Sequence, residues 1–187
     1  MSLFEEAVKF ALNAHSGMQR KTENTPYILH PLEAAVIVAA MTDDEEVLAA
    51  AVLHDTVEDT DTTAGDIRRI FGDRVADLVA SETEDKRPSL PPSETWRIRK
   101  EESLEALKRS GDPAVKILWM GDKLSNLRSL YKSWIHKGDV IWNDFNQKDP
   151  AEHAWYYREI CSLLSEYKET APWQELHNLI EIIFKGR

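Results

Sequence analysis

The sequence has little of what a secreted or membrane protein needs. Cys161 is the single cysteine among 187 residues, so no disulfide can form within the chain. It lies in an apolar stretch, which favours a buried structural thiol over a reactive one. No apolar run approaches the ~20 residues that a membrane-spanning helix requires. The first residues, MSLFEE, are acidic where a signal peptide is basic. These absences predict a soluble cytoplasmic protein with no membrane partner.

Positive charge is also scarce. The chain has 23 Lys and Arg against 33 Asp and Glu, a formal net charge of −10. A field of this sign repels phosphate backbones, so the composition argues against a nucleic-acid partner. A small phosphorylated ligand remains compatible with this charge if a few cations, or a metal ion, are concentrated in one cleft.

Strand-like alternation is hard to find, and helical periodicity dominates. Pro31 stands at the favoured first position of one helix, and Asp43 and Asp44 are cap candidates for the next. Two segments, 85–94 and 137–150, lack periodicity and are expected to be irregular. We find no repeats and no linker long enough to divide the chain. The pattern predicts an all-α fold, one domain over residues 1–187 with about eight to ten helices. Helices are expected around residues 3–12, 31–39, 43–52, 67–71, 75–79, 96–110, 114–135, 152–167 and 173–184.

Titratable side chains crowd the segment LHDTVEDT, residues 53–60. His54 and Asp55 end an apolar run, and Glu58 and Asp59 follow each of them by four positions. If the helix continues, each pair lies one turn apart on nearby faces. Placing so many titratable groups inside a protein is costly unless a cation compensates them. A divalent metal ion would do so directly.

Asp122 is a second anomaly, because it interrupts a strongly apolar segment. Asn126 follows one turn later and Ser129 two turns later along the same stripe. Polar groups that point inward need partners. His30, just before Pro31, is presented rigidly. Two imidazoles and two carboxylates suit Mn, Fe, Zn or Mg-type ions, and the histidines disfavour a pure Mg or Ca site.

Each feature has an ordinary structural explanation. His30 alone is more often a satisfied structural histidine, and Asp122 could cap a helix or form an ion pair. The pair Arg20–Lys21 would normally be a solvated loop pair, and adjacent His-Asp pairs such as His54–Asp55 arise often by chance. Only their joint occurrence, in this order, indicates a site.

That order resembles the HD-domain metal-dependent phosphohydrolases. The longer match resembles one branch, the hydrolase domain of RelA/SpoT-type enzymes and their stand-alone relatives, the small alarmone hydrolases of the metazoan SpoT homologue type. The length resembles the stand-alone form, without a synthetase or regulatory region. The segments that carry the resemblance are AHSGMQRK (14–21), PYILHP (26–31), LHDTVEDT (53–60), ETEDK (82–86) and GDKLSNLRSL (121–130).

The resemblance implies a role for each matching residue. Glu58 and Asp59 would position or deprotonate the attacking water. Arg20 and Lys21 would flank a guanine base. The metal ligands, for Mn²⁺ or another divalent transition metal, would be His30, His54, Asp55 and Asp122. The remaining substrate contacts would be Asn126 and Ser129 on the sugar or phosphate side and, by a looser match, Tyr156.

The implied activity is hydrolysis of the 3′-pyrophosphate of the guanine nucleotides ppGpp and pppGpp, which gives GDP or GTP and pyrophosphate. A metal ion lowers the pKa of water that it binds from ~16 toward ~7–9, and Glu58 or Asp59 would accept the proton. Lys123 is expected on another helical face, away from the ligands, and His15 is a candidate for an outer supporting role. Gly121 replaces the alanine more common in this branch, which mainly lowers helix propensity.

Two other functions stay open at this point. An HD phosphohydrolase acting on another nucleotide, such as the 2′-phosphate of NADPH or a nucleoside monophosphate, would share the metal ligands. Arg20–Lys21 and Asn126 favour the alarmone branch over it. A catalytically inactive nucleotide-binding module would lack the complete set of ligands and acidic residues, and this chain has them all.

Overall fold

The structure is a computed structural model, and it describes residues 1–20 and 24–187. Within these residues it contains ten α-helices and two 3₁₀ helices and no β-strand; an isolated antiparallel bridge joins Gln19 and Pro26. The predicted all-α fold is confirmed. The α-helices are α1 (Leu3–Ala14), α2 (Leu29–Ala39), α3 (Glu45–Leu53), α4 (Thr56–Asp59), α5 (Ala64–Phe71), α6 (Asp73–Glu82), α7 (Pro92–Arg109), α8 (Pro113–Lys137), α9 (Pro150–Leu163) and α10 (Ala171–Ile183). The 3₁₀ helices are η1 (Gly138–Asp144) and η2 (Ser165–Tyr167).

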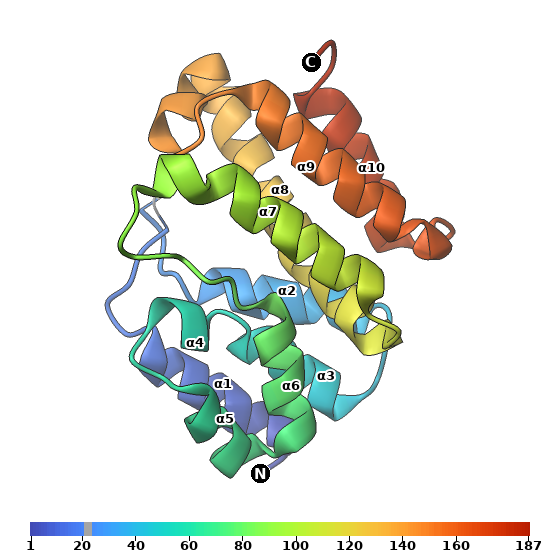
Figure 1. Ribbon diagram of the computed structural model, residues 1–187. Helices are drawn as coiled ribbons and strands as arrows, with labels where there is room; N and C mark the ends of the chain where they lie inside the picture. Colours follow the sequence, from blue (N-terminus) through green and yellow to red (C-terminus); the bar gives the residue numbers. More distant parts are fainter. Residues whose placement is uncertain (21–23) are drawn as a thin grey trace.

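The long helix α8 joins the two halves of the molecule. Figure 1 shows α1 to α6 in one half and α7, α9 and α10 in the other. The helix packs against α2, α3 and α6 as well as against α10 and η1. Twelve of its 25 residues are buried, as expected of a helix that has neighbours on several sides. None of the described helices is long and apolar enough to cross a membrane.

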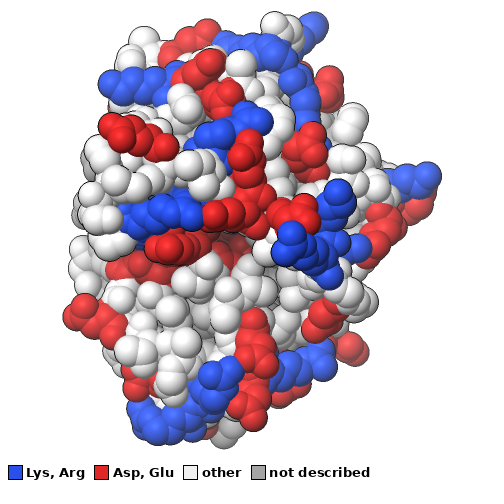
Figure 2. All heavy atoms as spheres, in the orientation of Figure 1, with Lys and Arg blue, Asp and Glu red and all other residues white. Residues whose placement is uncertain are grey.

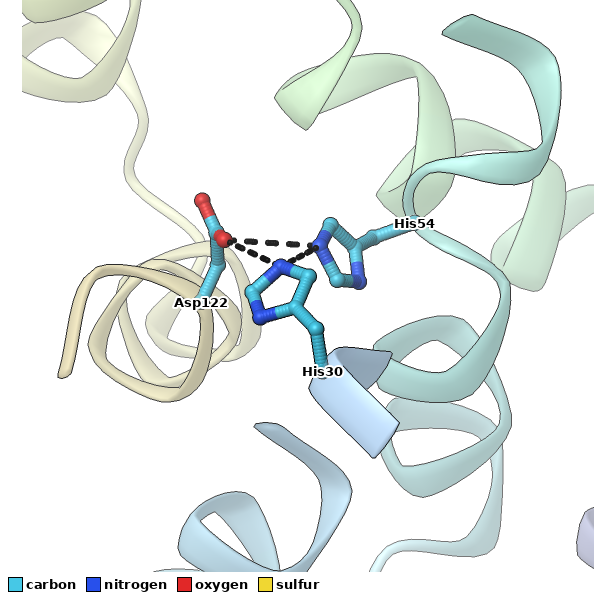
Figure 3. Close-up of side chains that lie close together, drawn as sticks. All are labelled: His30, His54 and Asp122. Carbon is cyan, nitrogen blue, oxygen red and sulfur yellow. Dashed lines mark hydrogen bonds and ion pairs between the residues drawn. The ribbon is translucent and has the colours of Figure 1, made fainter. Parts of the chain in front are cut away.

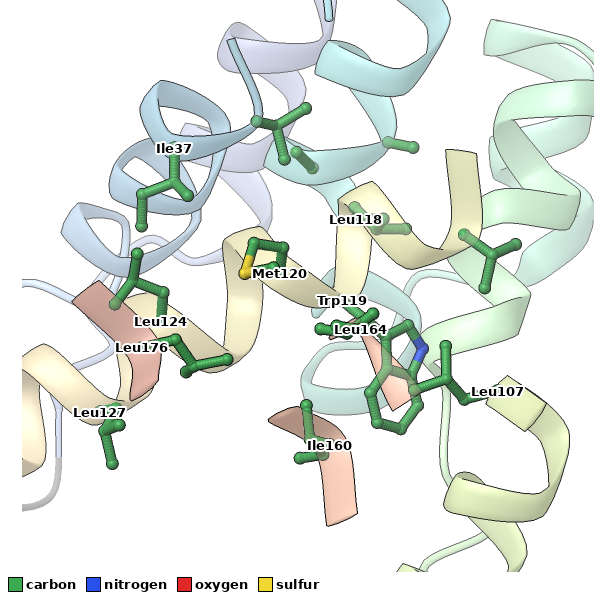
Figure 4. Packing of buried hydrophobic residues seen from close by; sticks show 14 of the residues in the cluster. Ile37, Leu107, Leu118, Trp119, Met120, Leu124, Leu127, Ile160, Leu164 and Leu176 are labelled. Carbon is green, nitrogen blue, oxygen red and sulfur yellow. The ribbon is translucent and has the colours of Figure 1, made fainter. Parts of the chain in front are cut away.

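Side chains from both halves meet around α8 in the hydrophobic core (Figure 4). Trp119 and Met120 are almost fully buried there. Each large side chain removed from water in this way contributes about 1.5–3 kcal/mol of hydrophobic stabilisation. This rigid centre fixes the position of the polar residues that interrupt the same helix. The other labelled core residues are Leu118, Leu124 and Leu127 of α8, and Ile37, Leu107, Ile160, Leu164 and Leu176.

Gly121 is needed for helix packing, whereas the sequence-based interpretation saw mainly a loss of helix propensity at this position. A Cβ atom there would lie 2.6 Å from Val38 Cγ2 and 2.8 Å from the Ala34 carbonyl oxygen. Both neighbours belong to α2, and the second contact is with backbone, which cannot rotate away. The glycine therefore allows α2 and α8 to approach closely.

One condition that the sequence left open is not met, and one local expectation is wrong. The helix that ends in His54–Asp55 does not continue: α3 stops at Leu53 and the short α4 starts at Thr56. The Thr56 hydroxyl donates a hydrogen bond to the Leu53 carbonyl at 2.6 Å, which competes with a regular helix at this point. Segment 137–150 is not wholly irregular either, because it contains η1, which buries Ile141 and Trp142.

Candidate active site

Two imidazoles and a carboxylate converge at one buried point (Figure 3). His30 stands at the start of α2, His54 directly follows α3, and Asp122 lies in the middle of α8. The Nε2 atoms of the two histidines are 3.2 Å apart. Asp122 Oδ1 lies 3.1 Å from His30 Nε2 and 3.4 Å from His54 Nε2. Three elements far apart in sequence thus bring these side chains together.

The hydrogen bonds of the outer ring nitrogens determine what the Nε2 atoms can do. His54 Nδ1 lies 2.8 Å from the Ala51 carbonyl, which only accepts, so Nδ1 carries the proton. The Ser125 hydroxyl donates to Glu33 Oε2 at 2.7 Å, which leaves its oxygen to accept from His30 Nδ1 at 2.9 Å. In the neutral rings both Nε2 atoms then present lone pairs to each other and to Asp122.

Facing lone pairs repel one another unless a cation lies between them. Imidazoles whose Nδ1–H groups are held by outer partners, together with carboxylate oxygens, form a donor set typical of divalent transition metals. Burial opposes the charge of Asp122, but the neighbouring Lys123 and the two histidines outweigh it and hold the pKa of Asp122 well below its usual value. The residues therefore fit a divalent metal ion.

Asp55 adjoins this cluster. Its Oδ2 lies 3.3 Å from His30 Nε2 and 3.1 Å from His54 Nε2. Tyr27 lies in the motif PYILHP, but the sequence alone gives it no role. Its hydroxyl lies 2.7 Å from Asp55 Oδ2 and 2.9 Å from Asp59 Oδ2, and so links the cluster to the acidic pair. Burial, together with these two carboxylates, raises the pKa of Tyr27 far above its ordinary value, so the hydroxyl keeps its proton.

The acidic pair Glu58 and Asp59 lies in α4, held by the segment that follows α6. The backbone N–H of Glu84 donates to Glu58 Oε2 at 3.1 Å. Lys86 Nζ lies 3.3 Å from Glu58 Oε1 and also contacts the Asp59 carboxylate. Burial is the main cause that raises the pKa of Glu58. A carboxylate with a raised pKa is a better proton acceptor near neutral pH.

A cleft of about 590 Å³ opens beside these groups. Figure 2 shows basic and acidic side chains interspersed on the face that it displays, without a broad patch of either sign. The cleft wall itself combines basic residues with aromatic rings, so it matches the expectation that cations are concentrated locally in an acidic chain. Its basic residues are Arg20, Lys86, Arg99, Lys100 and Lys123, and its aromatic residues include Tyr27, Trp96, Phe145, Tyr156 and Tyr157.

The remaining predicted substrate residues also line this cleft, with one exception. Arg20 Nη2 donates to Asn126 Oδ1 at 2.9 Å, and Asn126 Nδ2 donates to Asp122 Oδ1 at 2.5 Å. Ser129 and Tyr156 lie on the wall as well. Lys21 falls outside the described residues.

Lys123 corrects the sequence-based placement. Its Nζ contacts Asp122 Oδ2 and lies 3.1 Å from Glu82 Oε2. Asp122 and Lys123 leave α8 in different directions, but the flexible lysine stem turns its ammonium group back toward the Asp122 carboxylate. His15, a candidate for an outer role, is buried against the Tyr27 ring at 4.9 Å between centroids.

Glu82 leads to a prediction about stability and pH. It is buried, and burial outweighs the attraction of Lys123 and raises the pKa of Glu82 from 4.5 to about 8. A carboxyl group that binds its proton more tightly in the folded protein than in the unfolded chain stabilises the fold. This stabilisation is complete below pH 4.5, the ordinary pKa of a glutamate. That contribution is lost as the pH rises through the folded value.

Glu82→Gln keeps the neutral form at every pH. The test is urea unfolding of the metal-free protein between pH ~5 and ~9. The free energy of unfolding of this variant should fall less over this range than that of the wild type. The difference between the two should be a few kcal/mol, because each pKa unit corresponds to about 1.4 kcal/mol. The exposed Glu105, changed to Gln, is the control. Parallel curves for Glu82→Gln and the wild type would refute the prediction.

An all-helical chain that brings the set H…HD…D to one buried point has the architecture of the HD-domain class. The family model of the HD domain matches residues 7–142. The chain therefore belongs to the HD-domain family, and it is homologous to the MESH1 proteins. The predicted family resemblance is confirmed.

Several known proteins are similar to this chain. Human guanosine-3′,5′-bis(diphosphate) 3′-pyrophosphohydrolase MESH1 is 43% identical over 128 residues, which cover 67% of this chain and 68% of MESH1. The guanosine-3′,5′-bis(diphosphate) 3′-pyrophosphohydrolase of Aquifex aeolicus is 39% identical over 127 residues, and the match spans only 18% of that longer protein.

Solved structures agree with the fold. A metazoan orthologue of SpoT that hydrolyses ppGpp superimposes with a TM-score of 0.76 at 28% identity, over 97% of this chain and 96% of that one. The Listeria monocytogenes protein lmo0812 gives a TM-score of 0.72 at 36% identity, over 86% of this chain and 96% of that one.

Proposed function

We propose that this chain hydrolyses the 3′-pyrophosphate of guanosine-3′,5′-bis(diphosphate), releasing GDP and pyrophosphate, and that it acts likewise on the pentaphosphate to give GTP. The convergence of His30, His54 and Asp122 beside a cleft that holds an acidic pair and basic side chains carries this proposal. The homologous MESH1 proteins, which are named for this activity, support the choice of substrate.

The proposed metal ligands are His30, His54, Asp55 and Asp122, and the proposed ion is Mn²⁺. A divalent ion held there would supply Lewis acidity toward a phosphoryl oxygen and toward water. The Nδ1–H contacts of the two histidines to Ala51 and Ser125 keep their Nε2 atoms directed inward. The two carboxylates suit manganese, and the two imidazoles disfavour a site for magnesium or calcium alone.

Glu58 and Asp59 handle the proton in this proposal. A water oxygen bonds to the phosphorus next to the 3′ oxygen while the bond from that phosphorus to the 3′ oxygen breaks. Glu58, with its raised pKa, accepts the proton of the water. Asp59, which Tyr27 and Lys86 contact, orients the water. The 3′ oxygen leaves with GDP and takes up a proton to become the 3′ hydroxyl. The two phosphoryl groups, which now carry the oxygen of the water, are released together as pyrophosphate.

The substrate contacts follow the same proposal. Arg20 and Lys21 flank the guanine base. The guanidinium plane of Arg20 can stack on a ring, and Lys21 adds a second positive charge. Asn126, Ser129 and Tyr156 contact the sugar or the phosphates. The hydrogen bond from Arg20 to Asn126 supports one continuous surface for base and ribose.

The direct test is incubation of the purified chain with ppGpp and Mn²⁺, followed by ³¹P NMR and chromatography of the products. We expect GDP and pyrophosphate in equal amounts, and slower turnover when Mg²⁺ replaces Mn²⁺. NADPH and nucleoside monophosphates form the comparison panel. Release of orthophosphate alone, or turnover of NADPH but not ppGpp, would refute the proposal.

A further inference from the structure

Two basic side chains of α7, Arg99 and Lys100, line the cleft. Helix α7 carries none of the proposed metal ligands. The side chains of Arg99 and Lys100 are only 11% and 19% exposed. Both pair with one carboxylate: Glu84 lies 2.7 Å from Arg99 Nη1 and 2.6 Å from Lys100 Nζ. Two largely buried cations thus share a single anion, which leaves an excess of positive charge on this wall.

Hydrogen-bond donors in the same place also lack partners. The hydroxyl of Tyr156, on α9, is buried without a partner in the described part of the chain, and so is Arg99 Nε. Lys100 Nζ lies 4.9 Å from the centre of the Tyr156 ring, and Arg99 and Lys100 meet at the carboxylate of Glu84. Buried donors without acceptors cost free energy, and an anion with several oxygens would satisfy them.

The function proposed above includes Tyr156 among the contacts to the sugar or the phosphates, but it assigns no role to Arg99 or Lys100. Lys123, another cation of the cleft wall, already contacts Asp122. The Arg20–Asn126 pair belongs to the proposed base and ribose surface. Arg99 and Lys100 therefore remain as cations on the cleft wall without an assigned ligand.

We propose that Arg99, Lys100 and Tyr156 form an anion subsite that binds the diphosphate on the 5′ side of the substrate, the one that is not cleaved. The assignment rests on the proposed function. The planar arginine fork, a lysine point charge and a tyrosine hydroxyl together are a typical donor set for phosphate oxygens. The acidic remainder of the chain repels such a group, so these cations also orient the substrate along the cleft.

The kinetic test compares two substrates, ppGpp and guanosine 3′-diphosphate, which has a 5′-hydroxyl. In Lys100→Gln and Arg99→Gln we expect kcat/KM for ppGpp to fall about 10- to 100-fold, the range of a lost hydrogen bond to a charged group. The loss should appear mainly in KM. Guanosine 3′-diphosphate should be turned over at nearly the wild-type kcat/KM, which also shows that the variants fold. An equal loss on both substrates would overturn the subsite.

Lys108→Gln is the matched control, because Lys108 lies on the same helix but is exposed. It should leave both substrates unaffected. A loss of ppGpp turnover in Lys108→Gln as large as in Lys100→Gln would also overturn the assignment, since the effect would then reflect net charge.

A binding measurement separates this inference from the proposed function. Inorganic pyrophosphate is titrated calorimetrically into the chain kept metal-free with a chelator. We expect binding that weakens about 10- to 100-fold in Lys100→Gln and is unchanged in Lys108→Gln. If the wild type bound pyrophosphate in this way but hydrolysed no 3′-diphosphate, the proposed function alone would fail. Equal binding by the wild type and Lys100→Gln would refute the subsite.

Discussion

Replacement of His54 by alanine is expected to remove metal binding and turnover together. The imidazole lies at the centre of the cluster, with Nε2 within 3.4 Å of His30, Asp55 and Asp122. Its loss should weaken metal binding by more than about 100-fold, the upper end of the range for outer supporting residues. Metal content after dialysis, measured by mass spectrometry, and the rate of pyrophosphate release test this expectation. Asp55→Ala should behave alike.

The control for this experiment is His177→Ala, which removes an exposed histidine stacked on Trp173 in α10. That variant should keep the metal content and the rate of the wild type. A His54→Ala protein that retained a full equivalent of tightly bound metal would show that the ion, if bound, lies elsewhere.

The Glu58→Ala variant is expected to keep its metal binding and lose its turnover. The carboxylate of Glu58 contacts the Glu84 backbone and Lys86 rather than the histidines, so metal content should be unchanged. Turnover should fall about 10²- to 10⁴-fold, the usual contribution of a general acid or base. Calorimetric titration of metal together with single-turnover kinetics measures both.

The pH profile adds a second readout for Glu58. Because burial raises the pKa of this residue, the acidic limb of kcat/KM in the wild type should lie above 4.5, the ordinary value of a glutamate. The limb should disappear from the residual activity of Glu58→Gln. Full activity in Glu58→Ala would show that the assignment of the acidic pair is wrong.

The sequence predicted best those features that are local or carried by a motif. His54 and Asp55 end an apolar helical pattern, Asp122 interrupts one and His30 precedes one, and such positions are visible without coordinates. The all-α class followed from periodicity alone. The boundary between α3 and α4 was not predicted. It is accompanied by a hydrogen bond from the Thr56 hydroxyl to the Leu53 carbonyl, and periodicity does not reveal such a bond.

Contacts that depend on how helices pack could not be predicted. Arg99 and Lys100 look like ordinary charges on a polar helix until α7 is placed against α9. The return of Lys123 toward Asp122 depends on a side-chain conformation that helical angles do not specify. Tyr27 lies in the motif PYILHP, yet its link between Asp55 and Asp59 depends on how that motif packs against the segment of α4.

The glycine at position 121 has a consequence for the site itself. It touches the backbone of Ala34, one turn beyond His30, and it immediately precedes Asp122. The separation of the two helix axes at this crossing therefore sets the spacing between the His30 imidazole and the Asp122 carboxylate. A side chain of any size at position 121 would increase that spacing. Although such a residue touches no ligand, it would change the ligand geometry on which the choice of ion depends.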